Sequence, residues 1–67
     1  MQLVELRKTA KKSLAVVATD IGTTPSTVNR HERGITPISA FHRAAYAAYY
    51  RVKADSIEQP VGDEVAA

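Results

Sequence analysis

The pattern of apolar and polar positions along the chain predicts short helices throughout. Apolar residues recur every three or four positions in four stretches, and residues that cap or break helices separate these stretches. The stretches cover residues 2–11, 14–21, 25–33 and about 41–52. No stretch alternates apolar and polar residues as a half-buried strand would. We therefore expect an all-α protein, a compact bundle of four main helices with room for a short fifth turn through Ile57.

Local chemistry marks the ends of the two middle helices. Ser13 can cap the second helix, and Gly22 suits the left-handed residue that stops it. Thr24 followed by Pro25 starts the third helix, because the hydroxyl accepts from free amides and proline at the first helical position loses no hydrogen bond. Gly34 ends this helix. The sequence thus predicts two short helices joined by a tight turn.

Each helix is expected to turn one apolar face inward. On the first two helices this face contains Leu3, Leu6, Arg7, Ala10, Leu14, Val17, Ala18 and Ile21. On the fourth helix it contains Phe41, Ala44, Ala45, Ala48, Tyr49 and Val52. The flank with His42, Tyr46, Tyr50 and Lys53 is then expected at the surface. There, Tyr46 and Tyr50 either cover the neighbouring turn or form the contacts of a homodimer.

The third helix carries polar and cationic residues on one side. At about 100° per residue, four of its side chains fall within one arc, whereas Val28 and His31 fall on the opposite side. The four are Ser26, Asn29, Arg30 and Arg33. One face can pack while the other meets a ligand, which favours a nucleic acid as the partner. On the packed side, His31 is expected as a packing residue with one bonded nitrogen, not as a sensor or a metal ligand.

Charge is unevenly distributed along the chain. Residues 1–53 contain nine basic and three acidic residues, a formal charge of +6, whereas residues 54–67 contain four acidic residues, a formal charge of −4. A basic domain suits a phosphate backbone or an anionic membrane surface, or only keeps the protein soluble. We expect a DNA-binding domain over residues 1–59 and an acidic, disordered tail over residues 60–67.

The composition argues against several classes of function. The chain has no cysteine, so it forms neither disulfides nor thiolate metal sites, as suits a reducing compartment. It shows no signal peptide and no apolar run long enough to cross a membrane, so we expect a cytoplasmic protein. Catalytic side-chain sets and phosphate-binding glycine loops are missing, and no enzyme activity is expected. No cofactor, metal ion or small-molecule effector is expected either.

Five residues stand at fixed spacing around the predicted turn, and Glu-Arg-Gly follows at 32–34. The five are Val17, Ala18, Ile21, Gly22 and Val28. Over residues 3–52 this arrangement resembles the lambda-type repressor and Cro family, also called the XRE family, of helix-turn-helix proteins. The resemblance implies a small phage-type transcriptional regulator that binds double-stranded DNA, with residues 25–33 as the recognition helix in the major groove. It also implies an ion pair between Arg7 and Glu32.

The chain departs from that family at three places. One is His31, which stands where the family usually has an aliphatic or aromatic anchor. Leu14, Ala15 and Val16 stand where the family usually has a phosphate-binding glutamine followed by acids, and Pro25 replaces a base-reading side chain. Base contacts are therefore expected from Ser26, Asn29 and Arg30. Phosphate contacts are expected from Lys11, Lys12, Ser13, Thr24 and Arg33.

A second function stays open at this point. The apolar start of the second helix suits a helical protein-interaction module, an antirepressor or adaptor, that binds through Val16, Tyr46 and Tyr50. The cationic face of the third helix argues against this alternative.

Overall fold

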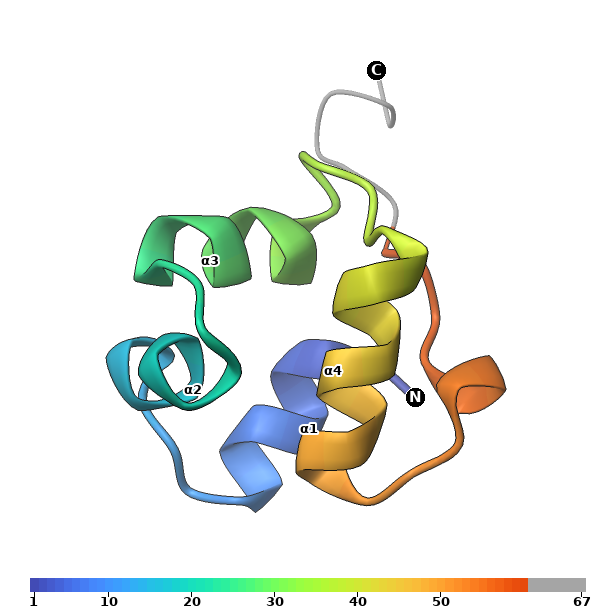
Figure 1. Ribbon diagram of the computed structural model, residues 1–67, viewed down its shortest axis with the longest axis horizontal. Coiled ribbons are helices and arrows are strands. Elements are labelled where there is room, and N and C mark those ends of the chain that lie inside the picture. The colour runs from blue at the N-terminus through green and yellow to red at the C-terminus, as the bar shows by residue number, and fades with distance from the viewer. Residues whose placement is uncertain (61–67) are drawn as a thin grey trace.

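The computed structural model describes residues 1–60, which form four α-helices and one 3₁₀ turn (Figure 1). The elements are α1 (Leu3–Thr9), α2 (Leu14–Ile21), α3 (Pro25–Arg33), α4 (Ala40–Tyr50) and η1 (Ala54–Ser56). No strand occurs in this part of the chain, so the all-α prediction is confirmed. Residues 61–67, which make up most of the expected acidic tail, lie outside the described residues.

Side-chain caps fix where three helices of the described chain begin. The hydroxyl oxygens of Ser13, Thr24 and Ser39 accept hydrogen bonds from the backbone N–H groups three residues later, at 3.1, 3.2 and 3.2 Å. At their C-terminal ends, α2 and α3 stop at Gly22 and Gly34, whose φ angles are 81° and 74°. The predicted bounds of α2 and α3 are confirmed, because each rests on a cap that the local sequence specifies.

Helix α4 ends earlier than its apolar pattern indicated. Arg51 adopts a left-handed conformation with φ 58°, and the Val52 N–H donates to the Ala47 carbonyl at 3.0 Å. This is the hydrogen-bonding pattern that closes a helix and turns the chain away. The chain then enters η1, and Ile57 becomes part of the core.

The inward face of α4 differs from the predicted one. Tyr46 and Ala47 are buried, whereas Phe41 is 76% exposed and Ala44 and Ala48 are also exposed. The prediction was wrong because five of the eleven residues of the helix are alanines, so counting apolar positions could not separate its two sides. A tyrosine also tolerates full burial when its hydroxyl finds a partner. Ala10, expected to face inward after α1, is likewise exposed.

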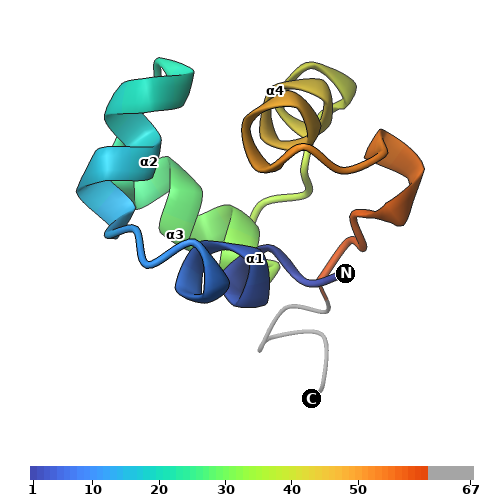
Figure 2. The ribbon, with the colours of Figure 1, turned by 90° about the horizontal axis from the view of Figure 1, so that it is seen from below.

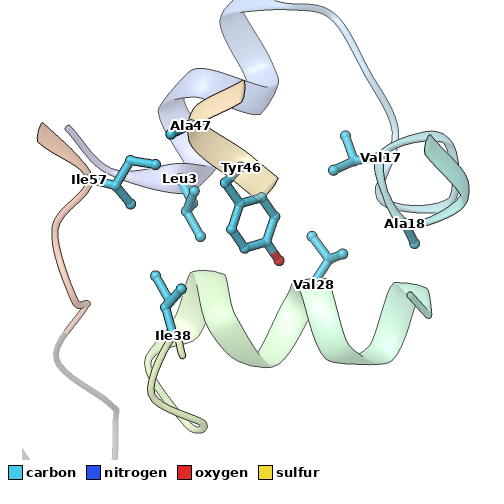
Figure 3. Close-up of a cluster of buried hydrophobic side chains, with 8 residues drawn as sticks. All are labelled: Leu3, Val17, Ala18, Val28, Ile38, Tyr46, Ala47 and Ile57. Carbon is cyan, nitrogen blue, oxygen red and sulfur yellow. The ribbon is translucent and has the colours of Figure 1, made fainter. Parts of the chain in front are cut away.

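The hydrophobic core gathers residues from every helix and from the segment after α4 (Figure 3). Its buried members are Leu3, Val17, Ala18, Val28, Ile38, Tyr46, Ala47 and Ile57. The segment after α4 also pairs with the N-terminus, since the Glu58 N–H donates to the Met1 carbonyl at 3.0 Å. None of the helices in residues 1–60 is long and apolar enough to cross a membrane.

Candidate nucleic-acid interface

Helix α3 lies along one edge of the molecule, packed against α2 (Figures 1 and 2). Ser26, Arg30 and Arg33 are exposed and Asn29 is half-buried. On the opposite side of the same helix, Val28 and His31 are 0% and 2% exposed. The packed side fixes the rotation of α3, so these four residues lie on the side of the helix away from the core.

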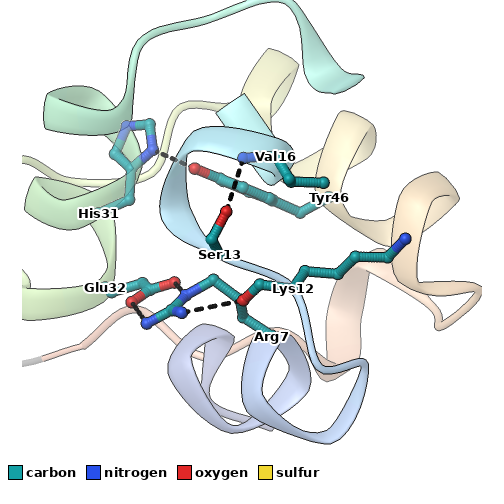
Figure 4. A network of polar contacts seen from close by, with 7 residues as sticks. All are labelled: Arg7, Lys12, Ser13, Val16, His31, Glu32 and Tyr46. Carbon is teal, nitrogen blue, oxygen red and sulfur yellow. Dashed lines mark hydrogen bonds and ion pairs between the residues drawn. The ribbon is translucent and has the colours of Figure 1, made fainter. Parts of the chain in front are cut away.

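A buried hydrogen bond anchors the packed side of α3 to α4. His31 Nδ1 lies 2.8 Å from the hydroxyl of Tyr46, and the two rings meet edge to face (Figure 4). Burial lowers the pKa of His31, and the nearby His42 lowers it further. His31 therefore takes the packing position that the sequence indicated, with Nδ1 bonded.

The loop before α2 presents the cationic residues expected at phosphates. Lys11, Lys12 and Ser13 are all exposed, and Ser13 caps α2 through an accepted hydrogen bond, which leaves its hydroxyl hydrogen to donate. Lys11 holds a left-handed φ of 58°, unusual for a residue with a side chain. Thr24 is also exposed, and its hydroxyl lies 2.9 Å from that of Thr27 as well as capping α3. Its hydrogen-bonding capacity is thus partly used within the protein.

One arginine joins this loop to the C-terminal end of α3 (Figure 4). Arg7 Nε and Nη2 donate to the two carboxylate oxygens of Glu32 at 2.6 and 3.1 Å, and Nη1 donates to the Lys12 carbonyl at 3.1 Å. The side chains of Arg7 and Glu32 are only 16% and 5% exposed. The hydrogen bond to Glu32 raises the pKa of Arg7. The ion pair that the family resemblance implied is thus present, and it holds α1, the Lys12 loop and α3 together.

The surface expected around Tyr46 and Tyr50 does not form. Tyr46 is fully buried, so it cannot serve as a dimer contact or as part of a surface for a protein partner. Tyr50 is half-buried and stacks on Tyr46, with ring centroids 6.4 Å apart. Burial raises the pKa of Tyr50 to about 12. Of the three residues assigned to the alternative protein-binding surface, only Val16, at 42% exposure, lies open to solvent.

Long-range hydrogen bonds that hold the loop after α3 and link α4 to α2 could not be predicted from the sequence. Gln59 brackets Ile38, accepting from its N–H at 2.8 Å and donating to its carbonyl at 2.7 Å, and so holds the loop that follows α3. The Tyr49 hydroxyl donates to the Asp20 carboxylate at 2.6 Å and links α4 to α2. These pairs lie 21 and 29 positions apart, and no local periodicity signals them. Within residues 1–60, no cluster of three or more metal-binding side chains occurs.

Helix α2 is capped at its start and is joined to α3 by a left-handed glycine turn. Helix α3 in turn has a packed side and an outward cationic side. This arrangement defines a helix-turn-helix protein. The sequence profile of the helix-turn-helix domain matches residues 1–59, and the chain belongs to this DNA-binding family, which is related to the XRE-type helix-turn-helix. No curated protein and no solved structure gives a significant match to the chain.

Proposed function

We propose that the protein is a sequence-specific transcriptional regulator of the repressor or Cro type, as in phages, that binds duplex DNA with α3 in the major groove. The outward arc of α3 carries this proposal, because it presents amide, hydroxyl and guanidinium groups from a helix whose other side is locked in the core. The family match and the excess of basic residues over 1–53 agree with it.

Three side chains on that arc are assigned to base edges. Asn29 can make two hydrogen bonds to adenine and Arg30 two to guanine, and Ser26 can donate to or accept from either type of base. Lys11, Lys12, Ser13, Thr24 and Arg33 are assigned to the phosphates on either side of the groove. The bidentate contact of Arg7 with Glu32 fixes the loop of Lys11, Lys12 and Ser13 relative to α3, because Arg7 also holds the Lys12 carbonyl.

A homodimer on DNA is part of the proposal. A single recognition helix of nine residues reads only a few base pairs, and a second copy on a symmetric site would supply the missing affinity and specificity. Selection of bound sequences from random duplex DNA tests the whole scheme. We expect an enriched motif with two-fold symmetry. Failure to enrich any motif would refute sequence-specific binding, and an asymmetric short motif would indicate a monomer.

The salt dependence of binding tests the phosphate contacts. Replacing Lys12 with alanine should weaken binding to all duplex sequences by a similar factor and reduce the slope of log affinity against log salt by about one unit. The measurement is a fluorescence anisotropy titration of a labelled duplex over a range of salt concentrations. Lys53→Ala is the matched control, since this exposed lysine directly precedes η1. Figure 1 shows η1, the orange turn, across α4 from α3. A slope for Lys12→Ala equal to that of the wild type would remove this residue from the interface.

A further inference from the structure

Two histidines and a tyrosine form a polar cluster between the recognition helix and α4. His31, from α3, is bonded to Tyr46 at 2.8 Å, and its ring centroid lies 4.8 Å from that of His42, one turn earlier on α4. His42 is half-buried, and its Nδ1 lies 2.9 Å from the hydroxyl of Ser39, the residue that caps α4. This cluster contains both histidines of the chain and joins the inner side of α3 to the first turns of α4.

The surroundings of His31 disfavour a positive charge. From α4 the ring faces Tyr46 and His42, and a proton on His42 would add a second charge beside it. The adjacent Glu32 already binds Arg7 of α1, and the only titratable residue of α2, Asp20, binds Tyr49. No carboxylate in residues 1–60 makes an ion pair or hydrogen bond with either imidazole. A protonated His31 would therefore be a charge with 2% exposure and no counter-ion.

We propose that His31 is a proton-sensitive positioning residue, and that protonating the His31–His42 pair loosens α3 from α4 and weakens DNA binding in mildly acidic conditions. The link to DNA rests on the proposed function, because α3 is the helix assigned to the major groove. The neutral pair holds the outward arc in its reading orientation. Two imidazolium rings at this spacing repel one another and favour conformations in which solvent reaches them.

The direction in which acid changes DNA affinity distinguishes protonation of the histidine pair from a general attraction between positive charge and DNA. Burial places the pKa of folded His31 below its ordinary value of 6.5, so the unfolded chain binds more protons just below that pH. The stability that neutral His31 contributes to the fold is fully present above about pH 6.5. It is lost as the pH falls from there towards the lower pKa of His31 in the folded protein. Added positive charge alone would strengthen binding to phosphates, whereas this device weakens it.

The protein itself provides the first test. Because the chain has two histidines, a proton NMR titration from about pH 8 to about pH 5 gives two imidazole curves, and His42→Asn assigns them. We expect His31 to titrate below the ordinary range. Over the same range the unfolding equilibrium should shift towards the unfolded state by about tenfold for each unit by which the pKa of His31 is lowered. An ordinary titration of His31, or a pH-independent unfolding equilibrium, would overturn the proposal.

The second test follows binding to a labelled duplex carrying the selected motif. We expect wild-type affinity to fall by about tenfold or more between about pH 7.5 and about pH 5 at constant salt. His31→Asn keeps a polar atom at the position of Nδ1 and cannot be protonated. The affinity of this variant for the duplex should therefore change little over the same pH range. A wild-type affinity that rises on acidification, or falls equally in both proteins, would contradict the switch. Absence of binding at every pH would refute the DNA-binding function, while the NMR and unfolding measurements would still decide the behaviour of His31.

Discussion

Replacing Arg7 with methionine is expected to lower the free energy of unfolding by about 3 kcal/mol, because it leaves the carboxylate of Glu32 buried without its partner. The structure supports an effect of this size, because both guanidinium–carboxylate bonds are made and the Glu32 side chain is only 5% exposed. A domain of this size has only a few kcal/mol of net stability, so the variant should be largely unfolded near body temperature. Urea denaturation followed by circular dichroism measures the loss.

Two further variants separate the charge of Arg7 from its shape. Arg7→Lys keeps the positive charge but cannot bind both carboxylate oxygens and the Lys12 carbonyl. Its stability should therefore lie between that of the wild type and that of Arg7→Met. Adding Glu32→Leu to Arg7→Met removes the buried charge and should recover part of the stability. If Arg7→Met costs less than about 1 kcal/mol, the pair behaves as an exposed ion pair and does not hold the three segments together.

Loss of sequence discrimination is the expected result of changing the outward arc of α3. Asn29→Ala and Arg30→Ala should each reduce the preference for the selected motif over random duplex DNA by about 1 to 3 kcal/mol, or roughly fivefold to 150-fold. Each removes a side chain assigned two hydrogen bonds to one base, and neither side chain belongs to the core. Competition titrations with motif and random duplexes at one salt concentration give the ratio.

The control for this prediction uses a change that conserves charge. Arg30→Lys retains the attraction to phosphate but loses the paired donors, so it should bind random DNA like the wild type and discriminate poorly. Thermal unfolding of both Arg30 variants should remain close to that of the wild type, because Arg30 is exposed. Unchanged discrimination in both alanine variants would exclude this arc as the reading surface.

Much of the fold follows from short stretches of sequence, for a physical reason. The limits of α2 and α3 depend on Ser13, Gly22, Thr24 and Gly34, each of which acts within its own helical turn. Local chemistry therefore suffices to place the two helices, and their 3.6-residue periodicity separates the packed side of α3 from its open side.

The arrangement of α4 could not be obtained in the same way. A run rich in alanine offers almost equal apolar area on several sides, so the choice of inward face falls to contacts with other elements. Here Tyr46 is drawn into the core because His31 satisfies its hydroxyl, fifteen positions away in the chain. The Gln59–Ile38 and Tyr49–Asp20 bonds depend on the assembled fold in the same manner, and no alternation or spacing in the sequence announces them.

At the turn between α2 and α3, backbone conformation and not lack of room explains the presence of Gly22. A methyl group added there would meet no atom within 4 Å outside its own stretch of chain, so crowding does not require glycine. Only the sign of its φ angle, +81°, does so. Asparagine, which tolerates that backbone conformation better than other side chains do, could replace it at a cost of about 1 kcal/mol. This corner is therefore open to evolutionary drift towards asparagine, provided that the rest of the domain has stability to spare.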